Sequence, residues 1–446
     1  MDFNLAELNE AMAAAAPDRE AIIQGSRRCS YAELAERSRR LASYLRDRGL
    51  EVTAERGDLD GWESGQPHLG LYLHNCPEYL EGMIGSYRAR VAPFNVNYRY
   101  VAEELRYLLT DAGAQAIVYH SSFADTLAEV RPDLPRLSVL IQVDDGSDHP
   151  LLDGAVWYED ALAAGDPAGP DVELSPDDLY ILYTGGTTGM PKGVLWRQGD
   201  IFPAALGGRQ LGLGIEWPDL DAIIEAAANG GVRMMPAPPF MHGAAHWMAF
   251  NAFTGGTTIV LPVQTTRLDP VDIWQTVERE KVNILLIVGD AFARPLLDEL
   301  DRGGYDVSSL LAVVSGGAAL SAPIKNALLA AMPAIAIMDG LGASETGQQA
   351  SQVTGAGTDA STGTFTPGPG MCIVDDDLTG LIDPTSDQVG WLAQEGRVPL
   401  GYLGDEEKTR RTFPVIGAVR YSVPGDRARY TADGLLDLHG RDSVTI

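Results

Sequence analysis

Short apolar segments alternate with amphipathic segments along most of the chain, and this order limits the folds available to it. Residues 30–50 start with Ser30 and carry leucines at helical spacing, which predicts a capped amphipathic helix. The apolar run at 69–75 predicts a buried strand, 77–90 a helix and 91–97 a second strand. Strand, crossover helix and strand in this order predict a parallel sheet covered by helices, which is an α/β fold.

The same alternation recurs further along the chain. Helix-like 101–113 precedes strand-like 114–120, helix-like 271–282 precedes strand-like 283–289, and two more apolar strands, at 310–317 and 334–342, run into glycine. The pattern shows no repeat of solenoid type.

The chain changes character from Gly363 onward, where Gly, Pro, Thr and Asp become frequent. Short alternating segments at 371–377 and 434–440 predict the hairpins of an antiparallel unit. The sequence stops at Ile446 within a strand-like segment, so we expect a shortened chain.

The strongest chemical signal follows the apolar strand at 179–182. Three threonines, three glycines and a lysine lie close together at Thr184, Gly185, Gly186, Thr187, Thr188, Gly189 and Lys192. Glycines allow the backbone to approach a phosphate closely, threonine hydroxyls donate hydrogen bonds to its oxygens, and the lysine supplies positive charge. The segment therefore predicts a phosphate-binding loop.

Two familiar motifs do not fit the sequence. A Walker-type loop needs Gly-Lys followed by Ser or Thr, whereas Lys192 is preceded by Pro191 and followed by Gly193. A zinc-protease helix needs a glutamate after its first histidine, which the sequence between His242 and His246 lacks.

The loop resembles the phosphate-binding signature of the adenylate-forming superfamily, which includes acyl-CoA synthetases, luciferases and peptide-synthetase adenylation domains. Residues 16–49 and 71–118 resemble the family's N-terminal segments in the same order. The amino-acid sequence at 183–197, 238–246 and 288–295 is similar to that of actinobacterial fatty-acyl and steroid-acid CoA ligases.

The resemblance implies a fold as well as a chemistry. Residues 1–441 are expected to form the family's large N-terminal domain, with two helix-covered, mostly parallel sheets and a small antiparallel, β-barrel-like unit at 363–441. Residues 442–446 would begin the hinge, placed at Ser443, and the family's C-terminal lid would be absent. Such a chain is expected to bind nucleotide and to turn over slowly.

The resemblance also assigns site residues. Lys192, Glu345 and Arg441 are the expected catalytic residues, with Glu345 as the ligand of Mg²⁺. The expected ATP and AMP contacts are Thr184, Gly185, Gly186, Thr187, Thr188, Gly189, Lys192, Gly316, Gly317, Ala318, Gly340, Leu341, Gly342, Ser344, Asp426 and Arg441. Leu341 stands where the family usually has an aromatic residue, so apolar contact is expected to replace stacking on adenine. The acyl pocket is expected at His242, Gly243 and Gly289.

The implied reaction is attack of a carboxylate on the α-phosphorus of ATP, followed by transfer of the acyl group from AMP to coenzyme A. Small residues around the acyl pocket and the resemblance favour a long-chain fatty acid or a steroid side-chain acid. Two alternatives stay open: an adenylation domain that loads a carrier protein, and a non-catalytic module that binds acyl groups or nucleotides.

The amino-acid composition limits the classes of partner that the chain can bind. The 33 Lys and Arg against 62 Asp and Glu give a net charge of −29, which disfavours nucleic acid as a partner. The expected partners are therefore a small carboxylic acid, ATP and CoA, and a homodimer is compatible with the sequence. Three widely spaced cysteines, no signal peptide and no long apolar run predict a cytoplasmic protein without a membrane span.

Overall fold

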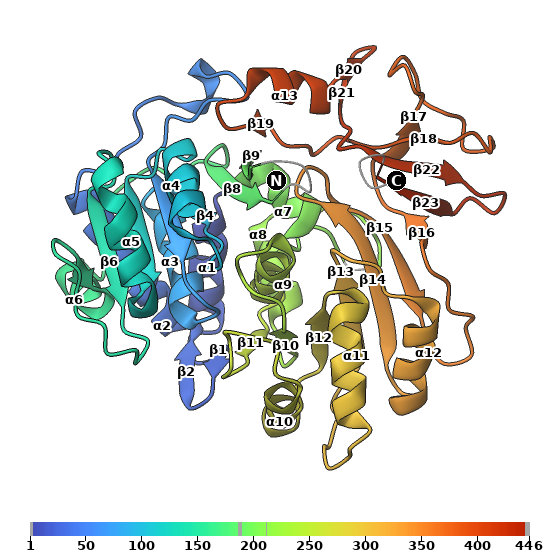
Figure 1. The fold of residues 1–446 in the computed structure, drawn as a ribbon, viewed down its shortest axis with the longest axis horizontal. Helices are drawn as coiled ribbons and strands as arrows, with labels where there is room; N and C mark the ends of the chain where they lie inside the picture. Colours follow the sequence, from blue (N-terminus) through green and yellow to red (C-terminus); the bar gives the residue numbers. More distant parts are fainter. Residues whose placement is uncertain (1–2, 186–189, 211, 442–446) are drawn as a thin grey trace.

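The computed structural model describes residues 3–185, 190–210 and 212–441 (Figure 1). In this part of the chain the strands form two sheets, with helices between them and outside them. None of the helices described is both long and apolar enough to cross a membrane.

The smaller sheet has eight strands in the order β19-β9-β8-β4-β3-β5-β6-β7. From β8 to β7 all neighbours are parallel, whereas β9 pairs antiparallel with β8 and β19 pairs antiparallel with β9. The bounds are β3 (His68–Tyr72), β4 (Ala92–Asn95), β5 (Ala116–His120), β6 (Val139–Val143), β7 (Val156–Trp157), β8 (Leu179–Thr184), β9 (Lys192–Arg197) and β19 (Gly401–Tyr402).

The larger sheet has a parallel and an antiparallel half. Strands β1, β11, β10, β12, β13 and β14 are parallel neighbours, and β2 adds an antiparallel edge. The bounds in this half are β1 (Glu20–Gln24), β2 (Arg27–Ser30), β10 (Arg233–Pro236), β11 (Thr258–Leu261), β12 (Ile284–Ile287), β13 (Ala312–Gly316) and β14 (Ala336–Ala343).

The antiparallel half begins at the hairpin from β14 to β15 and continues through β16, β23, β22, β18, β21 and β20, with β17 paired to β18. Its bounds are β15 (Gly347–Thr354), β16 (Thr364–Pro367), β17 (Met371–Val374), β18 (Gly390–Glu395), β20 (Val415–Ile416), β21 (Val419–Ser422), β22 (Asp426–Tyr430) and β23 (Leu436–Arg441).

This arrangement confirms the α/β fold and corrects one detail of it. The expected barrel-like unit is not closed in the described part of the chain. Because β15 pairs with β16 and β16 with β23, the late strands extend the edge of the larger sheet instead of pairing back on themselves.

Helices flank both sheets. Their bounds are α1 (Leu5–Ala15), α2 (Tyr31–Asp47), α3 (Pro77–Arg88), α4 (Ala102–Asp111), α5 (Ala124–Val130), α6 (Tyr158–Ala164), α7 (Gln198–Ala205), α8 (Leu220–Ala227), α9 (Gly243–Thr254), α10 (Pro270–Glu280), α11 (Gly289–Leu300), α12 (Ala322–Ala331) and α13 (Glu406–Thr412), with short 3₁₀ turns at Arg56–Asp58, Ser121–Phe123 and Arg131–Asp133. Helix α2 begins as predicted, since the Ser30 hydroxyl accepts a hydrogen bond of 3.2 Å from the Glu33 N–H.

Three apolar cores account for the layers. One lies between the sheets and unites β3 and β5 with α1, α2, α3, α9 and β11. A second joins the opposite side of the smaller sheet to α4 and α5, and a third joins the larger sheet to α10, α11 and α12. In β5, Val118 belongs to the first core while Ile117 and Tyr119 belong to the second. A strand buried on both sides has an apolar run in place of strict alternation.

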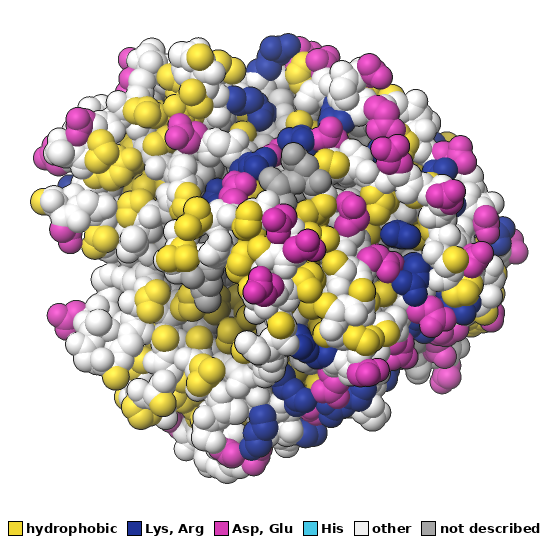
Figure 2. Space-filling model, turned by 180° about the vertical axis from the view of Figure 1, so that it is seen from behind, with side chains coloured by type: hydrophobic (Ala, Val, Ile, Leu, Met, Phe, Trp, Pro, Cys, Tyr) yellow, Lys and Arg dark blue, Asp and Glu magenta, His cyan; other side chains and the backbone are white. Residues whose placement is uncertain are grey.

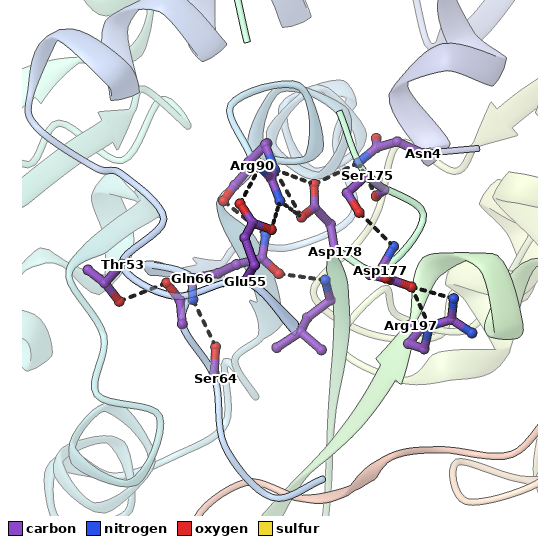
Figure 3. A network of polar contacts seen from close by, with 12 residues as sticks. Asn4, Thr53, Glu55, Ser64, Gln66, Arg90, Ser175, Asp177, Asp178 and Arg197 are labelled. Carbon is purple, nitrogen blue, oxygen red and sulfur yellow. Dashed lines mark hydrogen bonds and ion pairs between the residues drawn. The ribbon is translucent and has the colours of Figure 1, made fainter. Parts of the chain in front are cut away.

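An arginine two residues after the end of α3 fixes the start of β8 (Figure 3). Arg90 adopts a left-handed φ of 57°, and its guanidinium lies 2.9 Å from Asp178 Oδ1 and 2.8 Å from Glu55 Oε2. Asp178 directly precedes β8, and the Leu179 N–H donates to the Gln66 amide oxygen at 2.6 Å. The network therefore ties the segment 51–66 to the strand that leads into the predicted phosphate loop.

Basic side chains gather over β1, β2 and α10 near the lower edge of the face seen in Figure 2. Carboxylates partner them closely, because Arg28 lies 2.9 Å from the buried Glu280 and 3.2 Å from Glu20. Arg233 also pairs with Glu20, at 2.8 Å. The cluster is therefore a structural ion-pair network that leaves little charge for an anionic partner.

Candidate active site

The predicted phosphate loop connects the two strands of the β8–β9 hairpin. Thr184 ends β8, Lys192 begins β9, and the two residues are paired across the hairpin. Gly185 is exposed at the start of the loop. Gly186, Thr187, Thr188 and Gly189 lie outside the described residues. The hairpin gives Lys192 a fixed backbone position at the root of the loop.

The Lys192 side chain points into a group of acidic and hydroxyl side chains. Its ammonium lies 3.5 Å from Asp111 Oδ1 at the end of α4 and 3.8 Å from Asp405 Oδ2. The Tyr183 hydroxyl donates to the other Asp111 oxygen at 2.8 Å. Burial alone would lower the pKa of Lys192, but Asp111, the Tyr107 hydroxyl and Asp405 outweigh it and raise that pKa. Lys192 is therefore a stable cation at neutral pH.

Glu345 lies in the tight turn between β14 and β15, and three other strands hold this turn. The Tyr402 hydroxyl donates a hydrogen bond of 2.8 Å to Glu345 Oε1, and the Ser422 hydroxyl donates to the Glu345 carbonyl. The Trp196 indole N–H donates to the Ser344 carbonyl at 2.8 Å. Trp196 belongs to β9, the strand that begins at Lys192. The strand that begins at Lys192 is thus hydrogen-bonded to the turn that carries Glu345.

Two glycine-rich strand ends lie beside each other next to this turn. Gly316 at the end of β13 is paired with Gly340 in β14, and Gly317 follows with a φ of 82°. Ala318 is exposed after it. The nearest neighbour of a Cβ added to Gly340 would be 3.5 Å away, so this glycine is not required sterically, and the absence of a side chain leaves the face of the sheet uncovered there.

Local packing in β14 explains the residue types at Leu341 and Gly342. A Cβ on Gly342 would lie 2.3 Å from the Gly347 carbonyl oxygen, so the bulge between Leu341 and Gly342 requires glycine. Leu341 packs half-buried against the core of the antiparallel half, which includes Phe365.

The two predicted ribose-side residues come together in the antiparallel half. Asp426 begins β22, Arg441 ends β23, and their backbones are directly paired. Gly425, with a φ of 107°, makes the turn that leads into Asp426. The hairpin therefore places both residues at one end of the same strand pair.

The predicted acyl-pocket residues lie at the starts of two helices. His242 occupies the N-cap position of α9, but its side chain makes no capping hydrogen bond. Desolvation and the positive charge of Arg99 lower the pKa of His242. A Cβ on Gly243 would lie 2.9 Å from the Leu182 side chain in β8, and a Cβ on Gly289, whose φ is 55°, would lie 2.5 Å from the Ala319 carbonyl oxygen. Both glycines therefore permit close packing of a helix start.

A cavity of about 250 Å³ lies next to these helix starts. It sits where the carboxyl ends of β3, β4, β10 and β11 meet the first turn of α11, the usual place for a ligand in an α/β fold. The lining residues are Asn75, Tyr98, Arg99, Ala237, Pro239, Pro262, Gln264, Thr265, Arg267, Leu268, Ala291 and Phe292. His242, Gly243 and Gly289 are not among these residues, although each is close in sequence to one that is.

Sequence reasoning missed several polar residues of the site. Asp111, Tyr107, Tyr402, Asp405 and Lys408 all act on Lys192 or Glu345. The one available signal was an aspartate followed by Glu-Glu-Lys at 405–408, which predicts a capped helix start and not a site.

Known proteins resemble this chain in sequence and in fold. The model of the AMP-binding enzyme family matches residues 9–396. The medium-chain acyl-CoA ligase Mig of Mycobacterium avium is 52% identical over 445 residues, which cover 100% of this chain and 81% of that protein. A 3-oxocholest-4-en-26-oate–CoA ligase of Rhodococcus rhodochrous is 38% identical over 461 residues, covering 100% of this chain and 79% of that protein.

Solved structures share the fold at lower identity. The anthranilate CoA ligase AuaEII in complex with anthranoyl-AMP has a TM-score of 0.81 at 20% identity, covering 99% of this chain and 78% of that one. The N-terminal domain of FACL13 from Mycobacterium tuberculosis has a TM-score of 0.74 at 19% identity, covering 98% of this chain and 100% of that one.

Proposed function

The chain belongs to the family of AMP-binding enzymes, and on that premise we propose that Lys192, Glu345 and the glycines at the end of β13 and within β14 form its ATP site. Within the family the chain is an AMP-forming acyl-CoA synthetase, which activates a carboxylic acid with ATP and transfers the acyl group to coenzyme A. The assignment of individual residues is our proposal.

The observation that carries the proposal is the junction of β9 and β19. Tyr402 is paired with Val194, two residues after Lys192, and its hydroxyl binds Glu345. Asp405, three residues further on, lies 3.8 Å from the Lys192 ammonium. The pairing of β19 with β9 therefore brings Asp405 beside the Lys192 ammonium and Tyr402 to the carboxylate of Glu345.

In the first step, a carboxylate oxygen of the acid attacks the α-phosphorus of ATP and pyrophosphate leaves. Neither partner has to lose a proton, so the protein contributes by positioning and by stabilising charge. Lys192 would hold the β- and γ-phosphates that depart. Asp426 would accept hydrogen bonds from the ribose hydroxyls, and the face of the sheet that lacks side chains at Gly316 and Gly340 would receive the adenine.

A magnesium ion could be held by Glu345 together with the phosphates of the substrate. Residues 3–185, 190–210 and 212–441 contain no group of three His, Cys, Asp or Glu side chains that could hold a metal. Mg²⁺ commonly binds through one or two carboxylates together with substrate phosphates, and Glu345 meets that need. When bound, Mg²⁺ would neutralise charge on the phosphate oxygens.

For the acid, we propose an apolar chain of medium length or a bulkier apolar acid. The support is the medium-chain specificity in the name of the Mig ligase, the steroid acid in the name of the Rhodococcus enzyme, and the apolar part of the cavity at Ala237, Leu268 and Phe292.

Calorimetric titration with non-hydrolysable acyl-AMP analogues tests both parts of the proposal. Analogues carrying acetyl, decanoyl and steroid-acid groups should all bind, and the decanoyl analogue should bind at least about tenfold more tightly than the acetyl one, because buried apolar area contributes to affinity. Equal affinity for all three would refute the acyl class, and no binding of any would refute the ATP site.

A further inference from the structure

A second lysine stands close to the Lys192 group. Lys408 lies in α13, and its backbone N–H donates to Asp405 Oδ1 at 3.0 Å. The Lys408 ammonium sits over the Tyr402 ring, 4.1 Å from its centroid. The hydroxyl of the same ring binds Glu345. Lys408 therefore reaches the site through the residue that orients the proposed metal ligand.

The charges of Lys192, Asp405 and Glu345 all act on Lys408. Burial lowers its pKa, the carboxylates of Glu345 and Asp405 oppose this effect, and the positive charge of Lys192 adds to it. Each of these three side chains is thus near enough to influence the Lys408 ammonium.

The partner of Lys408 is an aromatic ring and not a carboxylate. Lys192 is paired with Asp111 and Asp405, whereas Lys408 forms no ion pair within the described part of the chain. A ring holds an ammonium over its face without neutralising the charge. Lys408 is therefore held in place while its charge stays available for an anion.

Arg410, a second cation on α13, differs from Lys408 because it lies at the surface. Arg410 lies 2.8 Å from Glu406, its side chain is 68% exposed, and its guanidinium lies over Trp62. Lys408 is half-buried and points to the site, whereas Arg410 is paired at the surface.

The balance of charges around Lys192 indicates a role for Lys408. Lys192 and Lys408 face the three carboxylates of Asp111, Asp405 and Glu345, so the group is short of positive charge. A polyphosphate brought here with Lys192 alone would meet an excess of negative charge, which opposes binding.

We propose that Lys408 is a second phosphate-binding residue, which contacts the terminal phosphates of ATP and the departing pyrophosphate. The inference rests on the proposed ATP site and deepens it. Lys408 would hold the β- and γ-phosphates together with Lys192, and it would make no contact with the α-phosphate that remains in AMP.

The test compares ligands with and without the terminal phosphates. Affinities of Lys408→Met and wild-type protein for Mg-ATP, Mg-pyrophosphate and AMP are measured by isothermal titration, with Arg410→Gln as the control for loss of one positive charge from α13. Lys408→Met should bind ATP and pyrophosphate roughly tenfold or more weakly, since a hydrogen bond to a charged group is lost, and should bind AMP as wild type does. Lys408→Arg should recover part of the loss, and thermal unfolding midpoints establish that the variants fold.

The possible failures are distinguishable. Unchanged affinity of Lys408→Met for ATP and pyrophosphate would overturn the inference, and so would an equal loss for AMP, which would indicate a general structural effect. If the wild-type protein binds none of the three ligands, the proposed ATP site fails and the inference falls with it.

Discussion

The hydroxyl of Tyr402 donates a hydrogen bond of 2.8 Å to Oε1 of Glu345. Because Tyr402 belongs to β19 and Glu345 to the β14–β15 turn, this bond joins the smaller sheet to the larger one. Tyr402 is also paired with Val194 of β9, which begins at Lys192. One tyrosine therefore contacts both the proposed metal ligand and the strand that begins at the proposed phosphate-binding lysine.

Removing that hydroxyl should weaken the dependence of nucleotide binding on magnesium. Tyr402→Phe deletes one hydrogen bond to a carboxylate, a loss of about 1.5–3 kcal/mol, and should weaken Mg-ATP binding about tenfold or more while AMP binding without metal is unchanged. Calorimetric titrations over a range of Mg²⁺ concentrations measure this. Tyr305→Phe is the control, since it deletes a Tyr–Glu hydrogen bond of 2.6 Å outside the site. An unchanged magnesium dependence would contradict the positioning role of Tyr402.

Removing the charge of Glu345 should lower activity without unfolding the protein. Glu345→Gln keeps the shape of the side chain and an oxygen that accepts from Tyr402, so the thermal unfolding midpoint should stay close to that of wild type. Exchange of radiolabelled pyrophosphate into ATP should fall at least about tenfold at low Mg²⁺, because the carboxylate charge is lost. Full exchange activity in the variant would place the metal ligand elsewhere.

A buried ion pair holds the strand that leads to the site. Lys325 in α12 is fully buried, and its ammonium lies 2.8 Å from Asp339 in β14, directly before Gly340. Lys325→Met leaves Asp339 buried without a counterion and should lower the free energy of unfolding by about 3–5 kcal/mol. Urea denaturation measures this, and Lys325→Met combined with Asp339→Leu should lose less than Lys325→Met alone. A double variant as unstable as the sum of both single variants would contradict a coupled pair.

The stability of the fold should decrease below neutral pH because of a buried histidine. His246 lies between the hydroxyls of Tyr79, 3.0 Å from Nε2, and Tyr180, 3.1 Å from Nδ1. The Tyr79 hydroxyl donates to the Phe240 carbonyl, so it accepts from Nε2–H, and Nδ1 accepts from Tyr180. Burial lowers the pKa of His246 from 6.5 to about 3.

The sign of the pH effect follows from that lowered pKa. Below pH 6.5 the unfolded chain binds a proton on this histidine and the folded chain does not, so stability is lost as the pH falls toward 3, by about 1.4 kcal/mol per pH unit. Urea midpoints at pH 7 and pH 5 should therefore differ more for wild type than for His246→Gln, which cannot titrate. Equal differences in the two proteins would show that His246 does not contribute.

Local patterns predicted much of the fold because strand and helix periods are properties of short segments. Residues 69–75 became β3, 77–90 became α3 and 271–282 became α10, each within a few residues. The open edge of the antiparallel half was not predictable in this way, because the pairing of β16 with β23 joins segments far apart in the sequence. No local pattern reports such a pairing.

The candidate site, too, could be predicted from the sequence only in part. The loop before Lys192 and the segment around Glu345 carry distinctive residues at fixed spacing, so the sequence indicated both. Tyr402, Asp405 and Lys408 reach them only because β19 pairs with β9 across some 200 residues of intervening chain. An aspartate at a helix start and a lysine one turn later are common in any sequence, and tertiary structure alone gives them their place.

A crystal structure of the chain bound to Mg-ATP would test the central claim most directly. The account predicts adenine beside Gly316 and Gly340, ribose hydroxyls on Asp426, and terminal phosphates within hydrogen-bonding distance of Lys192, with the magnesium ion on Glu345. Nucleotide bound elsewhere, for example in the cavity lined by Arg99 and Arg267, with no contact to Lys192 or Glu345, would contradict it.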